Sequence, residues 1–232
     1  MSLFKAGDLV ADVFAGVGPF AVPAARKSCL VFANDLNPSS THYLTGNCQE
    51  NRVQDRIRVT TMDGRDFIKH AVVEALDNPF VDIRPLQSSK ERSKQARSAQ
   101  PPPPPLPVQR AIKHFVMNLP ATAIEFLDAF RPAFTQEEHA PEIRELYRSA
   151  GMPVIHCHCF TRELERDRAE DDITRVSLIP GVMHPFSLCH SQRAETALGV
   201  ALTSPSFHYV RRVAPNKDMY CISFKLPDII MD

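Results

Sequence analysis

This sequence of 232 residues lacks an excess of charge, a disulfide framework and a long apolar run. Lysine plus arginine and aspartate plus glutamate both total 27, so no overall positive field indicates a nucleic-acid partner, and none is excluded. The six cysteines are scattered and follow no signal peptide, which predicts reduced thiols in a reducing compartment. Apolar runs such as Leu9–Ala15 are far shorter than the roughly 20 residues of a membrane helix, so we expect a soluble protein.

The length suits a single α/β domain over residues 1–232. Short apolar runs alternate with amphipathic stretches, the pattern of a parallel sheet with crossover helices. We predict strands over Leu9–Phe14, Leu30–Asp35, Ile57–Thr60, His114–Asn118 and Val154–Phe160, and a closing antiparallel pair over Phe207–Val213 and Met219–Leu226. Helices are predicted over Pro19–Lys27, over Ser39–Asn51 with Ser39 or Ser40 as cap, and over Ala121–Phe130. The expected fold is a doubly wound, Rossmann-like sheet of about seven strands with a C-terminal antiparallel hairpin.

One interruption of this pattern spans residues 84–109. It combines the cations Lys90, Arg92, Lys94 and Arg97 with the run Pro101–Pro105. Such a composition buries too little apolar surface to offset its ordering entropy, which predicts a disordered basic and proline-rich insertion. The insertion is either a tolerated surface loop or an electrostatic tether for RNA.

A second interruption, residues 176–192, is predicted to be an irregular insertion, because helix breakers such as Pro180 separate two charged helical segments. Without it, Ile173 would be followed by Ala194 and Leu198 at helical spacing, as one apolar stripe. The segment is either a genuine loop or a translated intron of the gene model. Sequencing of the mature transcript distinguishes the two.

The strongest functional signal is the segment DVFAGVGPF, residues 12–20, at the end of the first predicted strand. Gly16 and Gly18 let the backbone approach a ligand closely, and the helix that follows offers free N–H groups at its start. These glycines also fit the dinucleotide fingerprint, so the loop alone leaves a nicotinamide cofactor open. Asp12 places a carboxylate beside the loop, which suits a ligand with an ammonium group and repels a pyrophosphate.

Two further acids follow the next two predicted strands. Asp35 ends the second strand, where a carboxylate can accept hydrogen bonds from both hydroxyl groups of a ribose. Asp63 follows the third, where methyltransferases place an acid that bonds the adenine amino group. Each acid alone is equally a helix cap or a turn residue. Three acids at three successive strand ends favour S-adenosylmethionine as the cofactor.

Asn118-Leu119-Pro120 follows the fourth predicted strand. The carboxyl ends of the strands of a doubly wound sheet carry the ligand crevice, so the amide of Asn118 and the ring of Pro120 are expected to face the target. The alternative is a strand-to-helix turn without a function, because proline often opens a helix.

The run His156-Cys157-His158-Cys159 contains the residue types that bind zinc. In a strand, however, alternate side chains face opposite ways, so these four cannot close around one ion. We therefore expect no metal site.

Five segments together resemble the eukaryotic and archaeal type of tRNA (guanine-37 N1)-methyltransferase, which is a class I S-adenosylmethionine-dependent RNA methyltransferase. They are DVFAGVGPF at residues 12–20, NDLNP at 34–38, DGRDF at 63–67, MNLPA at 117–121 and VRRVAPNKDMYC at 210–221. The resemblance covers nearly the whole chain except the two interruptions. It implies transfer of a methyl group from S-adenosylmethionine to N1 of guanine 37, next to the anticodon of tRNA, with positioning as the main source of acceleration.

The resemblance also implies roles for individual residues. Asn118 and Pro120 are expected to hold the target guanine. The expected cofactor contacts are Phe14, Asp35, Leu36, Asp63, Gly64 and Asn118, beside Asp12, Gly16 and Gly18 from the pattern itself.

Guanine N1 must lose its proton to a general base. In the family, the glutamate with this role, an arginine near O6 and a tRNA-binding domain lie upstream of the first strand, whereas only Met1–Asp8 precede it here. We therefore expect the chain as given to be an impaired fragment.

Two alternatives remain open: a related transferase that adds an aminocarboxypropyl group in wybutosine synthesis, and a catalytically incomplete module that binds the cofactor or RNA. Family members occur in cytoplasm, nucleus and mitochondrial matrix, so we expect one of these compartments, and a monomer.

Overall fold

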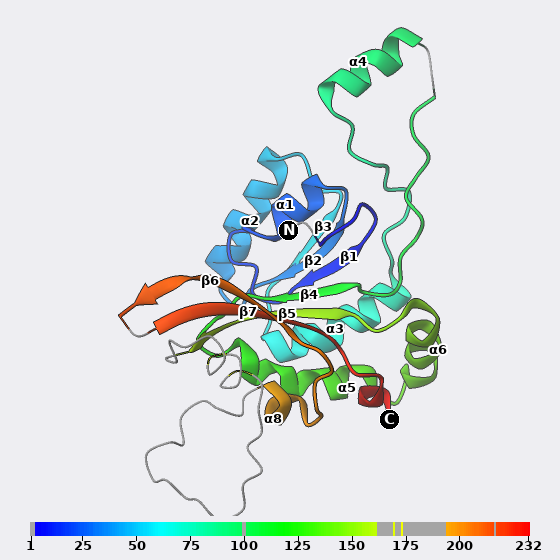
Figure 1. The fold of residues 1–232 in the computed structure, drawn as a ribbon. Helices are drawn as coiled ribbons and strands as arrows, with labels where there is room; N and C mark the ends of the chain where they lie inside the picture. Colours follow the sequence, from blue (N-terminus) through cyan, green and yellow to red (C-terminus); the bar gives the residue numbers. More distant parts are fainter. Residues whose placement is uncertain (1–2, 99–100, 162–168, 170–172, 174–193, 216) are drawn as a thin grey trace, which may run out of the picture.

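The computed structural model describes residues 3–98, 101–161, 169, 173, 194–215 and 217–232 (Figure 1). The strands are β1 (Leu9–Asp12), β2 (Leu30–Asn34), β3 (Ile57–Thr60), β4 (His114–Met117), β5 (Val154–Thr161), β6 (Ser206–Ala214) and β7 (Lys217–Lys225). The helices are α1 (Ala21–Arg26), α2 (Pro38–Glu50), α3 (Gly64–Asp77), α4 (Ser89–Ser98), α5 (Phe130–Phe134), α6 (Ala140–Ala150) and α8 (Ala194–Leu198), with the 3₁₀ helices η1 (Ala123–Ala129) and η2 (Asp228–Met231).

The strands form one seven-stranded sheet in the order β3-β2-β1-β4-β5-β7-β6. The first five in this order run parallel, and β7 runs antiparallel to both β5 and β6. The predicted doubly wound sheet with a C-terminal antiparallel hairpin is confirmed. Its strand order reverses between β1 and β4, which in such sheets opens a crevice at the carboxyl ends of these strands.

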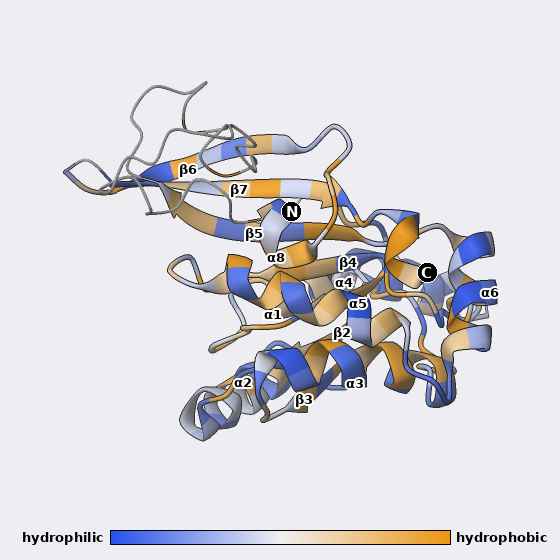
Figure 2. Ribbon diagram, turned by 90° about the horizontal axis from the view of Figure 1, so that it is seen from below, coloured by the Kyte–Doolittle hydropathy of each residue, from blue (hydrophilic) through white to orange (hydrophobic). Residues whose placement is uncertain are grey.

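Helices cover both faces of the sheet (Figure 1). The larger buried cluster joins the sheet to α3, η1, α5 and α8, and includes Phe67, Phe115 and Phe130. The smaller lies under α1 and α2, around Val31 and Leu44. In Figure 2, β7 is largely apolar and α6 largely polar, as expected of buried strands and a surface helix. Among the described helices, none is both long and apolar enough to cross a membrane.

Two helix predictions are corrected. The cap of α2 is Asn37, whose side chain accepts a hydrogen bond from Ser39 N at 3.0 Å, and not Ser39 or Ser40. Pro38 stands at the first helical position, where its fixed φ favours an earlier start. The helix predicted over Ala121–Phe130 is instead η1 followed by α5. Pro132 has no N–H group to donate to a continuing helix, so the chain starts a new helix that holds this proline in its first turn.

Within the predicted insertion, residues 84–109, the structure has a ten-residue helix, α4, which the composition alone did not indicate. A capping box starts this helix: Ser88 N donates to Glu91 Oε2 at 2.6 Å, and Glu91 N donates to Ser88 Oγ at 3.2 Å. The expectation that the segment buries little is confirmed, because α4 has no buried residue. Figure 1 shows α4 standing away from the sheet.

The segment 176–192 lies outside the described residues. The flanking residues Ile173, Ala194 and Leu198 are buried in the same core cluster. This placement agrees with a shared apolar stripe and leaves the loop and the intron hypotheses open.

A buried asparagine ties the ends of the first three strands together. Asn34, the last residue of β2, donates from Nδ2 to Val13 O at 3.2 Å and to Met62 O at 3.0 Å. Its Oδ1 accepts from Thr60 Oγ1 at 3.0 Å and from Met62 N at 3.0 Å. Every donor and acceptor of this amide is therefore used, and it joins the segments that follow β1 and β3 to the end of β2.

Replacing this amide should destabilise the domain strongly. Asn34→Leu leaves two carbonyl groups, one N–H group and one hydroxyl without their partner, and should lower the free energy of unfolding by about 3 kcal/mol or more. Urea denaturation measures the change. Asn51→Leu, at the exposed end of α2, is the control and should cost about 0.5 kcal/mol or less. Equal losses in both variants would contradict the proposed tie.

Candidate functional site

The loop after β1 owes its shape to two glycines with positive φ, +55° at Gly16 and +96° at Gly18. A Cβ atom on Gly18 would lie 2.6 Å from Leu44 Cδ1 and 2.9 Å from Val22 Cγ2, so this glycine lets the loop pack against α1 and α2. A Cβ atom on Gly16 would meet nothing within 4 Å. Gly18 is thus required by packing, whereas Gly16 borders open space that a ligand can approach.

Asp35 connects this loop to the one that follows β2. Its Oδ2 accepts a hydrogen bond from Gly16 N at 2.9 Å, and its Oδ1 accepts one from Asn37 N at 2.9 Å. The side chain is half-buried. Each carboxylate oxygen has a second lone pair. Asp35 can therefore hold the loop and, at the same time, accept a hydrogen bond from a hydroxyl group of a ligand.

Asp63 is the N-terminal cap of α3, which is the alternative role that the sequence left open for it. Its Oδ1 accepts a hydrogen bond from Arg65 N at 2.8 Å. Among the described residues, no hydrogen bond reaches its Oδ2. Beside it, a Cβ atom on Gly64 would lie 2.8 Å from Phe14 Cε1 and 3.0 Å from Phe126 Cδ1. Gly64 therefore admits an aromatic pair, whose rings meet edge to face with centroids 4.9 Å apart.

Asp12 is fully buried at the end of β1, and neither carboxyl oxygen has a hydrogen-bond partner among the described residues. Burial raises the pKa of this carboxyl to about 7, the N–H groups of Ala21 and Phe14 partly oppose the shift, and Asp35 adds to it. Repulsion of a pyrophosphate by Asp12 thus requires a pH above about 7. A buried carboxyl without a hydrogen-bond partner among the described residues suits an ammonium group.

Asn118 and Pro120 lie directly beyond β4, at the same edge of the sheet. The carbonyl of Pro120 accepts from Phe160 N at 3.1 Å, which fixes it to β5. Among the described residues, no hydrogen bond to the Asn118 side chain is found, so its amide is available to a ligand. Large apolar side chains stand exposed at this edge: Leu36 by 67%, Val17 by 50% and Leu119 by 39%. They offer apolar surface to a planar ring.

The fold thus places the predicted site residues at the carboxyl ends of β1, β2, β3 and β4: Asp12 ends β1, Gly64 begins α3, and the others lie on the connecting loops. Their roles remain predictions. Sequence reasoning missed Asn34, Phe126 and Leu119. Leu119 and Asn34 both lie inside recognised motifs, but the partners of Asn34 and Phe126 come from distant segments and leave no local signal.

The histidine and cysteine run lies in β5, and its side chains alternate as predicted. His156 Nε2 lies 3.1 Å from His114 Nδ1, and His156 Nδ1 lies 2.8 Å from Ser223 Oγ. Cys157 and Cys159 are buried in the core. No cluster that could hold a metal ion is found within the described part of the chain.

Asp12 makes a measurable contribution to the pH dependence of stability. Between its ordinary pKa of 3.8 and the folded value of about 7, only the unfolded state loses the proton, so the free energy of unfolding falls as pH rises. His156 has the opposite effect on stability, because burial lowers its pKa to about 4.

Chemical denaturation should therefore compare the stability of wild type with that of Asp12→Asn. The stability of the variant relative to wild type should rise from pH 4 to 7 and then level off. A difference that does not change with pH contradicts the burial of an ionisable carboxyl, and Asp55→Asn, at an exposed position, is the control.

Comparison with known proteins identifies relatives. Residues 1–78 match the family model described as the TRM5/TYW2 methyltransferase domain. A tRNA (guanine(37)-N(1))-methyltransferase of Coprinopsis cinerea is 47% identical over 241 residues, which cover 98% of this chain and 48% of the relative. That of Mus musculus is 41% identical over 226 residues, which cover 97% of this chain and 35% of the relative. The chain thus spans about half the length of these relatives or less.

Among solved structures, M. jannaschii TYW2 in complex with AdoMet aligns with 96% of this chain and 70% of that one, at 17% identity and a TM-score of 0.52. This likeness shows a shared fold. The relatives confirm the resemblance found in the five motifs: along nearly its whole length, this chain is related to the tRNA (guanine(37)-N(1))-methyltransferases.

Proposed function

We propose that this chain binds S-adenosylmethionine and the target base in an enzyme that methylates N1 of guanine 37 in tRNA. The observation that carries the proposal is the alignment of the tRNA (guanine(37)-N(1))-methyltransferases over at least 97% of the chain, at identities of 37–47%. The geometry of the strand ends supports it independently.

The strand ends fit the three parts of the proposed cofactor. Asp12 is a buried carboxyl without a partner and suits the ammonium group of the methionine part. Asp35 retains acceptor capacity for the ribose hydroxyls while it holds the Gly16 loop. The free Oδ2 of Asp63 can accept from the adenine amino group, and the exposed Leu36 and Leu119 offer apolar contact to the purine. When bound, the cofactor supplies an electrophilic methyl group.

The target base is proposed to lie against Asn118 and Pro120. The Asn118 amide offers both donors and an acceptor to the edge of a guanine, and Pro120 is fixed by its hydrogen bond from β5. Positioning of this kind is the largest contribution that these residues make to an in-line transfer. Loss of the N1 proton requires a general base, which the family resemblance assigns to a segment upstream of β1.

The aminocarboxypropyl transferases are the second candidate. The matching family model covers both TRM5 and TYW2 proteins and does not separate them. The named relatives favour methyl transfer. The mass of the modified guanosine distinguishes the two reactions.

Cofactor binding is testable by calorimetry. We expect weak binding of S-adenosylmethionine and none of a nicotinamide dinucleotide. Asp35→Ala should weaken binding by at least about tenfold, because it removes charge-assisted hydrogen bonds to the ribose. Affinity should also rise between pH 6 and 8 in wild type but not in Asp12→Asn, because an ammonium group binds the ionised carboxyl. Asp55→Ala, at an exposed site, is the control and should leave affinity unchanged. Preference for the dinucleotide would overturn the cofactor assignment.

Methyl transfer is testable with tRNA transcripts that carry guanine or adenine at position 37. Fusion to the upstream half of the Coprinopsis cinerea relative should give 1-methylguanosine at position 37 of the guanine transcript alone. The chain as given should react slower by about 100-fold or more, because a general base contributes on that order.

Asn118→Ala should abolish transfer by the fusion, and Asn51→Ala should not. Full activity of the unfused chain would contradict the impaired-fragment hypothesis. An aminocarboxypropyl group on the tRNA, in place of a methyl group, would favour the second candidate reaction over the proposed one.

A further inference from the structure

We propose that α4 is an RNA-binding element whose cations contact backbone phosphates away from the target base. The basic arm is defined as α4 with its two connecting segments, residues 84–98 and 101–109. The inference rests on the proposed tRNA substrate and adds to it a second contact surface.

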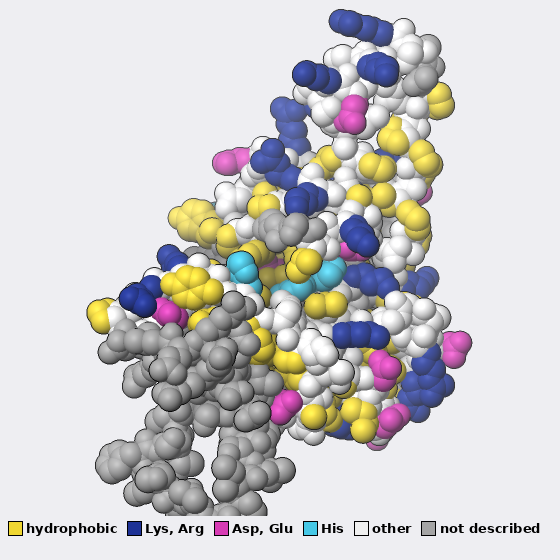
Figure 3. All heavy atoms as spheres, viewed as in Figure 1, with side chains coloured by type: hydrophobic (Ala, Val, Ile, Leu, Met, Phe, Trp, Pro, Cys, Tyr) yellow, Lys and Arg dark blue, Asp and Glu magenta, His cyan; other side chains and the backbone are white. Residues whose placement is uncertain are grey.

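The arm concentrates positive charge in a chain whose formal net charge is zero. Four cations and one acid lie within the ten residues of α4, and all five side chains are exposed. Figure 3 shows Lys and Arg side chains gathered on this projecting part of the molecule. The single acid, Glu91, caps the helix through Ser88, whose hydrogen bonds lower its pKa and keep it ionised. Four cations against one anion still leave α4 with an excess of positive charge.

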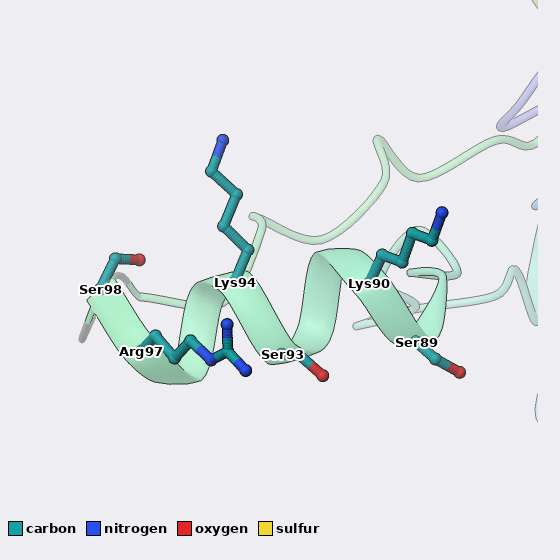
Figure 4. Close-up of a pocket in the computed structure, with 6 residues that line it drawn as sticks. All are labelled: Ser89, Lys90, Ser93, Lys94, Arg97 and Ser98. Atoms are coloured by element: carbon teal, nitrogen blue, oxygen red, sulfur yellow. The ribbon is translucent and has the colours of Figure 1, made fainter.

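Three of these cations share one face of the helix. Lys90, Lys94 and Arg97 stand at spacings of four and three, with Ser93 between them on the same stripe. They line a shallow depression together with Ser89, Ser93 and Ser98 (Figure 4). Cations interleaved with hydroxyl donors are the side chains that most often contact phosphate oxygens.

The stem of the arm is attached to the body by hydrogen bonds. Leu86 N donates to Ser28 Oγ at 2.9 Å, and Leu106 N donates to Ile83 O at 2.7 Å. Arg56 Nη2 donates to Arg84 O at 2.6 Å. Ser28 lies two residues before β2 and Arg56 one residue before β3, so the arm leaves from the amino ends of the strands. The arm and the candidate site lie at opposite ends of strands that are about 13 Å long. A ligand that contacts both must therefore be longer than these strands, and a folded RNA stem is long enough.

The composition of α4 favours RNA over other polyanionic surfaces. The sequence SKERSKQARS has no large apolar side chain, whereas a helix that lies on a membrane needs an apolar face. Protein interfaces are usually centred on aromatic or large apolar anchors, which α4 also lacks. Phosphate binding needs only cations and hydrogen-bond donors, and these are what the helix presents.

The test compares tRNA binding by the 232-residue chain and by the triple variant Lys90→Gln, Lys94→Gln, Arg97→Gln, using fluorescence anisotropy over a series of salt concentrations. We expect the variant to bind at least about tenfold more weakly at low salt, and the slope of log affinity against log salt to fall by about 2 to 3. Arg131→Gln, Arg148→Gln, Lys225→Gln, at exposed positions elsewhere, is the matched control and should change neither quantity. No buried side chain is altered, so melting temperatures should agree.

The inference is overturned if the arm variant binds tRNA with the affinity and salt slope of wild type, or if wild type binds no tRNA. Loss of binding to an acidic peptide with unchanged tRNA binding would assign the arm to a protein partner instead. Failure of the proposed function has a different result: arm-dependent RNA binding persists, but the fusion protein transfers no methyl group to guanine 37.

Discussion

The candidate site depends on one buried side chain, the amide of Asn34. The loops that follow β1, β2 and β3 meet at the carboxyl edge of the sheet. Their backbone N–H and C=O groups lie beyond the strand ends, so no neighbouring strand can form hydrogen bonds with them. Asn34 pairs three such groups, from Val13 and Met62, and also the hydroxyl of Thr60. Asp35 directly follows Asn34, and Asp63 directly follows Met62, so this amide fixes the spacing of the two acids assigned to the cofactor. The same bonds that complete the fold thus position the site.

The rest of the edge combines groups that stabilise the fold with groups that cost stability. Gly18 and Gly64 allow close packing against Leu44 and Phe14, which favours the folded state. Asp12 has the opposite effect, because its buried carboxyl has no hydrogen-bond partner among the residues that the structure describes. Residues that break the usual rules of burial occur mainly at functional sites, where a ligand completes the missing interaction. Asp12 is the residue at this edge that most needs a ligand.

The inner strands β1, β2, β4 and β5 were predictable because each is a short apolar run that is largely buried on both faces, a local property of the sequence. The strand ends therefore agree within about two residues. The errors arise where a specific partner decides the outcome. The helix expected over Ala121–Phe130 is a 3₁₀ helix, η1, which ends where α5 begins, two residues before Pro132. The Ser88–Glu91 pair starts α4 in a segment whose overall composition predicts disorder. The role of Asn34 was not predictable, because its partners lie about 20 to 30 residues away in the sequence.

The balance of 27 basic and 27 acidic residues hides a separation of charge within the molecule. The basic arm extends from the amino ends of the strands, whereas the acids Asp12, Asp35 and Asp63 lie at the carboxyl ends. At physiological ionic strength the Debye length is about 8 Å, shorter than the strands that separate the two regions. The field of α4 is therefore largely screened at the candidate site. The basic arm and the acids of the candidate site can coexist in one small domain because the sheet keeps them apart.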